Sequence, residues 1–173
     1  MGLMDILQNA LAANSGSGGA DGATAEQHFD QAAQHASTDE LGAGLAGAMR
    51  SDQTPPFGEM VGKLFGQSSS AQQAGVLNQI LATLGPAAAS AIAGGALGRI
   101  LSPGQTQVTP AQASALSPAQ VTEIAAHAEQ AQPGIVDQVS QFYAQHSGLI
   151  KMLGSAALMV TLAKMKENAT TRG

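Results

Sequence analysis

The spacing of apolar residues constrains the fold of this chain more than any other feature. Phe57, Met60, Val61, Leu64 and Phe65 recur every three or four positions and share one face of a helix. No segment of the sequence shows the sustained alternation of apolar and polar residues that is typical of a half-buried strand. We therefore predict an all-α protein of about eight or nine short helices in a compact orthogonal bundle, with two helical halves as an alternative arrangement.

Stretches rich in glycine, serine and proline indicate how the chain is organised. They predict an N-terminal amphipathic helix over 1–14, a Gly/Ser linker over 15–23, a helical domain over 24–101, a linker over 102–110 and a C-terminal helical subdomain over 111–173. The second linker is a plausible boundary between two helical halves.

Cap residues place several helix starts. Ser37 or Thr38 precedes an acidic first turn, and Thr54-Pro55 places proline at the first position of the next helix. The sequence Ser/Thr-Pro-Ala-Gln occurs twice, at 109–112 and 117–120. Each copy combines an N-cap with a proline at the first helical position, so we expect a helix to begin at both.

The composition limits how the core is built. Charged residues make up 11% of the chain, against roughly a quarter in typical globular proteins, and aromatic residues make up 3%. The core must therefore consist mainly of leucine, isoleucine, methionine and alanine. Helices lined with alanine approach closely but bury little area each, so stability must come from many contacts. The expected anchors are Phe57, Met60, Phe65, Phe142 and Tyr143.

Motifs for catalysis or ligand binding are missing from the sequence. The chain has no cysteine, no glycine-rich phosphate loop and no serine nucleophile motif. His28 and His35 are seven residues apart, two helical turns, which is too far for one metal ion without another ligand. We therefore expect no catalytic, cofactor-binding or metal-binding residues, no small-molecule substrate and no enzymatic activity. A net charge of −5 without a basic cluster disfavours nucleic acid as a partner.

Small residues dominate the stretch "GPAAASAIAGGALGRIL" at 85–101, which carries one charge. Gly85-Pro86 predicts the end of one helix and the start of the next. Small side chains then recur every four residues on two neighbouring ridges, formed by Ala87, Ala91 and Gly95 and by Ser90, Gly94 and Gly98. Such ridges permit close approach of another backbone, which offsets the roughly 1 kcal/mol that each helical glycine costs.

Three interpretations of this stretch remain open. It could be a contact within the core of a monomer, or a membrane span over 80–98, although that range has few large aliphatic residues and is interrupted by Gly85-Pro86. In the third, Ala87, Ser90, Ala91, Gly94, Gly95 and Gly98 form a contact between subunits of a homo-oligomer. Arg99 is the only charged residue between Lys63 and Glu123, and a neutral surface is easily buried by a partner. We take this third interpretation as the leading hypothesis.

The C-terminal region contains a second apolar tract, flanked by lysines. We expect Ser147 to cap one long helix over 148–167, with an uncharged run that is too short to cross a bilayer unaided. It is either a core helix surrounded by other helices, which we favour, or a membrane-interface anchor with snorkelling lysines. Its candidate residues are Lys151, Met152, Leu153, Leu158, Met159, Val160, Leu162 and Lys164.

The N-terminus does not have the pattern of a targeting segment. Asp5 lies where a secretory signal has basic residues, and Ile6 lies where a myristoylation motif has serine or threonine. We expect a cytoplasmic protein, with association with the inner membrane as the alternative.

The opening "MGLMDIL" and the later "DELGAGLAGAM…LFGQSSSAQQAGVLNQILATLG" resemble YidB-like bacterial proteins and related bacterial domains of unknown function. The resemblance covers roughly residues 1–100 and lies in composition as much as in motif, and the second half of the chain departs from it. It implies a bacterial origin and no catalytic role, and it supplies no functional residues. Together these observations predict a non-enzymatic, self-associating structural or interaction protein. A peripheral membrane protein anchored by its C-terminal helix is the alternative.

Overall fold

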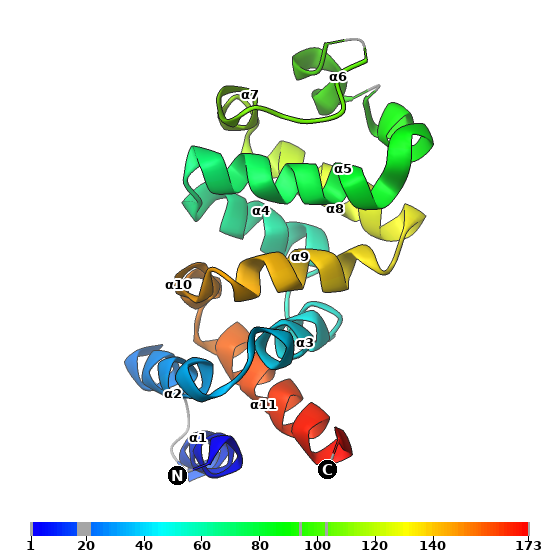
Figure 1. Cartoon of the computed structure of the whole chain (residues 1–173). Coiled ribbons are helices and arrows are strands. Elements are labelled where there is room, and N and C mark those ends of the chain that lie inside the picture. Colours follow the sequence, from blue (N-terminus) through cyan, green and yellow to red (C-terminus); the bar gives the residue numbers. More distant parts are fainter. Residues whose placement is uncertain (1, 17–21, 94, 103, 173) are drawn as a thin grey trace.

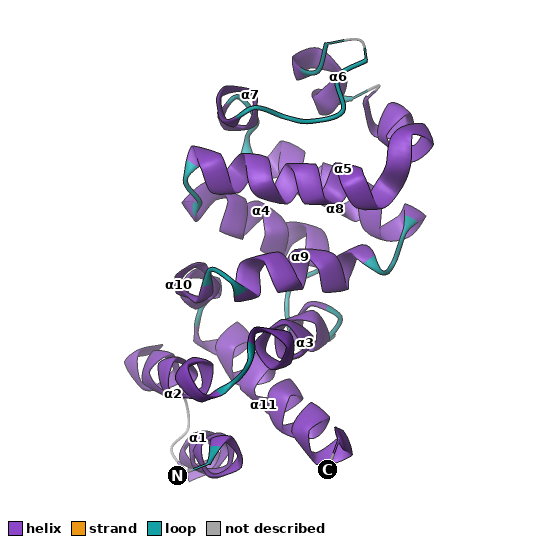
Figure 2. Cartoon of the chain, in the orientation of Figure 1, coloured by secondary structure: helices purple, strands orange, loops and turns teal. Residues whose placement is uncertain are grey.

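The computed structural model describes residues 2–16, 22–93, 95–102 and 104–172, and all regular structure in these ranges is helical (Figure 2). The elements are α1 (Leu3–Gly16), α2 (Gly22–His35), α3 (Thr38–Met49), α4 (Phe57–Gln67), α5 (Ser70–Ala93), α6 (Ala96–Ile100), α7 (Pro110–Ser114), α8 (Pro118–Ala131), α9 (Ile135–Ala144), α10 (Ser147–Ile150), the 3-10 turn η1 (Lys151–Leu153) and α11 (Ser155–Arg172). Among them α6, α7 and α10 have five residues or fewer. The other eight described helices become nine when α5 is divided at its kink at Gly85, so the predicted all-α fold is confirmed.

The helices are stacked along one direction (Figure 1). At one end, α5 packs against α6, α7, α8 and α9, and α4 packs on α8. Further along, α3 packs against α9 and α11, and α1 and α2 pack on α11 at the opposite end. Helices from both sides of the 102–110 segment therefore contact one another, and their apolar residues form one hydrophobic cluster.

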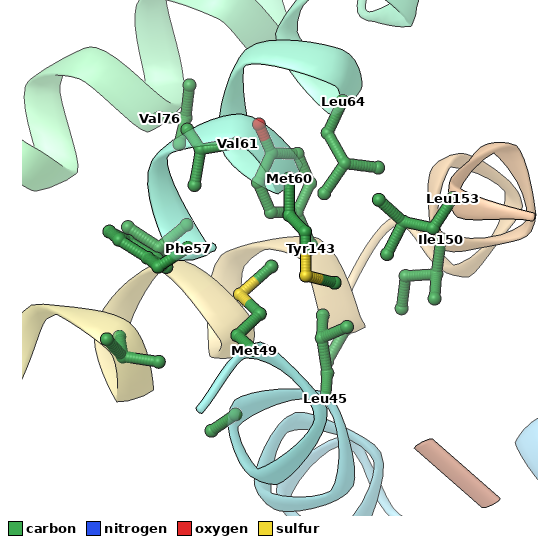
Figure 3. Packing of buried hydrophobic residues seen from close by; sticks show 14 of the residues in the cluster. Leu45, Met49, Phe57, Met60, Val61, Leu64, Val76, Tyr143, Ile150 and Leu153 are labelled. Atoms are coloured by element: carbon green, nitrogen blue, oxygen red, sulfur yellow. The ribbon is translucent and has the colours of Figure 1, made fainter. Parts of the chain in front are cut away.

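Aromatic residues and methionine anchor this core. Phe57, Met60 and Phe65 of α4 are at most 2% exposed, and Tyr143 of α9 is fully buried. Figure 3 shows side chains of α3, α4 and α9 meeting around Tyr143. These four predicted anchors are confirmed. Phe142 is only half-buried, and its ring meets the Tyr143 ring edge-on with 5.4 Å between the centroids.

Four of the described helices begin with a capping box, which satisfies backbone N–H groups that have no partner within the helix. The pairs are Ser37 with Glu40 for α3, Ser69 with Gln72 for α5, Thr109 with Gln112 for α7 and Ser117 with Gln120 for α8. Both copies of Ser/Thr-Pro-Ala-Gln open a helix with proline in the first turn, as the sequence predicts. The predicted break at Gly85 is also confirmed, because its φ of 76° lies in the left-handed region.

Thr54 does not cap α4, contrary to the prediction. Its hydroxyl donates to the carbonyl oxygens of Ala48 and Ser51, and α4 begins later, at Phe57. Because the last carbonyl groups of a helix lack partners within that helix, Thr54 completes the end of α3 instead.

The prediction of one helix over 148–167 is wrong. The chain turns at Gly154, whose φ of 98° favours glycine, and this turn separates α10 and η1 from α11. Polar contacts fix the turn: Lys63 Nζ donates to the carbonyl oxygen of Leu153 at 3.3 Å, and Lys151 Nζ lies 3.1 Å from a carboxylate oxygen of Asp30.

Candidate association surface

One end of the molecule presents a surface with almost no charge. α6, the segment that follows it and α7 lie over α5 at this end, and the first turn of α8 follows α7 (Figure 1). The exposed residues described between positions 95 and 119 are Gly95, Gly98, Arg99, Ser102, Gly104, Thr106, Gln107, Thr109, Pro110, Ala111, Ser114, Ala115, Ser117, Pro118 and Ala119. We name this set the neutral end, because Arg99 is its single charged residue.

The predicted oligomer interface falls partly on the neutral end. Gly95 and Gly98 are exposed there, whereas Leu97 between them is fully buried. Gly98 of α6 and Gly95, which directly precedes this helix, are therefore both open to solvent. The other predicted interface residues cannot be placed on this surface: Gly94 lies outside the described residues, as do the side chains of Ala87, Ser90 and Ala91.

Asn78 of α5 connects the neutral end to the rest of the fold. Its Nδ2 donates to the carbonyl oxygen of Val108 at 3.1 Å, and its Oδ1 accepts from the Val108 N–H at 2.6 Å. One side chain thus satisfies both main-chain groups of Val108, whose own side chain is 3% exposed. The segment before α7 is held against α5 without a charged group.

Gln105 and Gln112 form a reciprocal amide pair within the same region. The Nε2 of each donates to the Oε1 of the other, at 2.8 and 3.2 Å. Gln112 also donates to the carbonyl oxygen of Ile100 at 2.6 Å, and Gln105 accepts from the backbone N–H of Ser102 at 3.0 Å. The end of α6, the following segment and α7 are therefore joined by neutral groups, which leaves the outer surface neutral as well.

Sequence reasoning missed the roles of Asn78, Gln105 and Gln112. Gln112 is recognisable as the third residue of a capping box, but that pattern says nothing of its bond to Ile100. Asn78 contacts Val108, 30 residues further along the chain, while Gln105 joins α7 to the segment just before it. No local signal identifies them, since uncharged amides are also common on helix surfaces.

The ion pairs recorded in the described part of the chain lie away from the neutral end. Arg50, which ends α3, donates from both guanidinium nitrogens to the carboxylate of Asp137 in α9, each at 2.8 Å. These hydrogen bonds lower the pKa of Asp137 and raise that of Arg50. The charges of this pair are therefore used to join helices of the same chain.

The apolar residues of the C-terminal tract are mostly covered by other helices. Leu158 and Leu162 are fully buried, and Leu153 and Met159 are each 8% exposed, where α11 packs against α1, α2 and α3. Met152 in η1 is the exception at 51% exposed.

The remaining residues of this tract are at its partly exposed edge. Val160 is half-buried, Lys151 pairs with Asp30, and Lys164 Nζ lies 2.9 Å from a carboxylate oxygen of Glu167. Across the described ranges, every helix is too short or too polar to cross a membrane.

Groups that could perform chemistry are dispersed. In the part of the chain that the structure describes, no three histidine, cysteine, aspartate or glutamate side chains gather closely enough to hold a metal ion. Burial raises the pKa of the Tyr143 phenol, and the nearby Ser68 hydroxyl opposes this shift. Tyr143 therefore stays neutral at physiological pH and serves as a core residue. The expectation that the protein is not an enzyme stays a prediction.

Comparison with known proteins gives no match at a significant level to any protein-family model, curated protein or solved structure. The resemblance of residues 1–100 to YidB-like bacterial proteins therefore stays a prediction. What the protein does must be inferred from its own surface.

Proposed function

We propose that this chain is a non-enzymatic, self-associating protein of the bacterial cytoplasm, whose copies meet through the neutral end. The observation that carries the proposal is the uneven distribution of charge. Arg99 is the single charged residue among the exposed residues described from Gly95 to Ala119. The other described charged residues lie at or before Lys63 and at or after Glu123.

The physical basis is the low cost of covering such a surface. Burying a charged side chain requires removal of tightly bound water and a compensating partner, whereas small side chains and backbone-like amides require much less. Contact between two neutral ends also keeps most of the charges that give each chain its net charge of −5 away from the interface, since Arg99 is the one charge that this surface carries. Exposed glycines at Gly95 and Gly98 permit close approach of a second backbone.

The alternative, anchoring to a membrane through the C-terminal tract, requires a rearrangement of the fold. Leu158 and Leu162 are fully buried against neighbouring helices, so they reach a lipid surface only if α11 leaves the core. Self-association through the neutral end needs no such change.

The test adds charge to the neutral end without disturbing the fold. Ala111 and Ala119 are exposed and each lies one position after the proline that begins α7 or α8. Glutamate in a first helical turn is favoured by the helix dipole, so Ala111→Glu with Ala119→Glu should fold normally. Ala156 is the matched control, since it is exposed in the first turn of α11, outside the neutral end.

Size-exclusion chromatography with light scattering supplies the readout. We expect the wild type and Ala156→Glu to associate, and the Ala111→Glu/Ala119→Glu variant to elute at the monomer mass of 17.3 kDa. Association through a neutral surface should also persist between about 0.05 and 0.5 M salt, because few charges are available to screen. Equal association of both glutamate variants would contradict the placement of the interface at the neutral end.

A further inference from the structure

His146 links the α9–α10 corner to α5. It occupies the N-cap position of α10, where Ser147 was expected, and its backbone N–H donates to the Tyr143 carbonyl oxygen at 2.8 Å. Its imidazole Nδ1 lies 3.4 Å from Nε2 of Gln72 in the first turn of α5. The ring also lies beside Phe142, with 5.1 Å between centroids and a tilt of 58°.

The orientation of the Gln72 amide is fixed from its other side. Gln72 Oε1 accepts from the backbone N–H of Ser69 at 3.0 Å, and the Ser69 hydroxyl accepts from the Gln72 N–H at 3.3 Å. This reciprocal pair is a capping box for α5. Rotating the amide by 180° would point its NH₂ group at the Ser69 N–H and lose the cap. Nε2 is therefore the atom that faces His146, and Nε2 can only donate.

A donor at Gln72 determines the protonation state that suits His146. The neutral imidazole with its proton on Nε2 presents a bare Nδ1, which accepts from Gln72. A protonated imidazole carries hydrogen on both nitrogens, so two donors would face each other. We propose that His146 and Gln72 form a proton-sensitive latch between α5 and the α9–α10 corner, which holds while His146 is neutral and is released when it is protonated.

Among the described residues, none of the recorded ion pairs involves His146. α5 and α10 contain no charged residue. The charged residues of α4, α9 and η1 are Glu59, Lys63, Asp137 and Lys151. Asp137 is held by Arg50, Lys63 donates to the carbonyl oxygen of Leu153, and Lys151 pairs with Asp30.

The latch lies where α5 and α9 are already in close contact. A Cβ on Gly75 of α5 would lie 2.8 Å from the ring of Phe142, so the two helices approach closely beside His146. Since α5 also carries α6 and α7, release of the latch loosens the connection between the neutral end and the rest of the molecule.

The variant Gln72→Glu tests the latch because it replaces the amide donor that faces His146 with a carboxylate acceptor and keeps the capping box. A glutamate can still accept from Ser69, but it presents a carboxylate to His146 and so favours the protonated imidazole. The contact with Gln72 contributes to stability only while His146 is neutral, whereas the carboxylate of Gln72→Glu contributes more once His146 is protonated. The variant should therefore lose less stability than the wild type, or gain stability, when the pH is lowered from ~8 to ~5.5.

The readout is the equilibrium constant for unfolding in urea, measured across this pH range at a protein concentration low enough to keep the chain monomeric. Relative to the wild type, Gln72→Glu should change the ratio of the constants at the two pH limits by roughly threefold to tenfold, as expected for one hydrogen bond. When His146 is replaced by asparagine, the unfolding constant should have the same pH dependence with and without Gln72→Glu. Identical profiles of the wild type and Gln72→Glu with His146 present would overturn the latch.

A second measurement does not depend on the variants folding. Nitrogen-15 NMR of the native protein at about pH 7.5 distinguishes the two neutral tautomers of a histidine. The latch requires His146 to carry its proton on Nε2, with Nδ1 bare. A proton on Nδ1 would overturn the proposal, because the amide of Gln72 would then have to face it with oxygen.

Discussion

Two glycine-bearing regions of this molecule differ in what lies against them. In α4, Gly58 faces α8, and a Cβ at this position would lie 2.6 Å from the backbone oxygen of Thr122. Gly62, one turn later, faces the backbone oxygen of Pro118 in the same way, at 2.7 Å. In α6, by contrast, Gly98 is exposed. Contacts within the chain explain Gly58 and Gly62, whereas Gly98 lies on an exposed part of its helix.

The difference teaches how to interpret a stripe of small residues. Spacing alone predicts that a backbone approaches, but not whether that backbone belongs to the same chain. The neighbouring charges separate the two cases here. Gly58 and Gly62 alternate with the exposed Glu59 and Lys63, so α4 has one face for α8 and another for water. The neutral end has no comparable charged face, since it carries only Arg99.

Replacing Gly58 with alanine should have the largest effect on stability. The added methyl group meets a backbone oxygen of α8, which cannot rotate away, so the helices must separate. We expect the free energy of unfolding in urea to fall by about 2–3 kcal/mol. Gly134→Ala is the control, because a Cβ there meets nothing within 4 Å, and it should change stability by less than about 1 kcal/mol. Equal losses would mean that α4 and α8 do not approach as described.

The Gln112→Ala variant should have an intermediate effect, confined to the neutral end. It removes the bonds to Gln105, to the carbonyl oxygen of Ile100 and to the Thr109 N–H of the capping box, and we expect the free energy of unfolding to fall by about 1–2 kcal/mol. Hydrogen exchange of residues 100–109 should accelerate, while that of α3 and α11 should not. The exposed Gln107, replaced by alanine, is the control. Unchanged exchange at 100–109 would show that the amide pair does not hold this surface.

Removing the Arg50–Asp137 ion pair between α3 and α9 should have a smaller effect on stability, and this effect should depend on pH. Folding lowers the pKa of Asp137, so the pair stabilises the protein above pH ~4, the ordinary pKa of an aspartate. This contribution is lost as the pH falls through the lowered pKa of the folded state. The side chains are 45% and 53% exposed, so Asp137→Asn should cost only up to about 1 kcal/mol at neutral pH. At a pH below the lowered pKa of Asp137, the wild type and Asp137→Asn should have the same free energy of unfolding in urea. A difference that persists there would show that the effect does not come from the ion pair.

Gly98→Ala should have the smallest effect on the monomer and thus gives the sharpest contrast with Gly58→Ala. Gly98 is exposed within α6, so alanine should leave stability unchanged or raise it by less than about 1 kcal/mol. A larger side chain, in Gly98→Leu, should weaken self-association while the monomer stays folded, as judged by circular dichroism. Unfolding of Gly98→Leu at low concentration would show that Gly98 is packed within the chain.

Features that depend on a few adjacent residues could be predicted from the sequence. The Ser/Thr-Pro-Ala-Gln copies open α7 and α8 because capping boxes and an early proline act locally. Gly85-Pro86 ends one helix and begins another for the same kind of reason. The apolar spacing of Phe57, Met60 and Phe65 identified the buried face of α4.

Features that depend on distant partners could not be predicted. The apolar pattern continues through Gly154, and only the packing of η1 against α4 and α2 shows why the chain turns there. Thr54 has the sequence context of an N-cap, but the end of α3 supplies carbonyl groups that it bonds instead. Asn78 holds the neutral end through Val108, which no local pattern links to it.

The molar mass of the wild-type protein in solution, measured by light scattering over a wide range of concentration, tests the central claim most directly. The account predicts a mass above the 17.3 kDa of one chain that rises with concentration and returns to one chain when Ala111 and Ala119 are replaced by glutamate. A folded wild-type protein that remains at 17.3 kDa up to the highest concentration would contradict it.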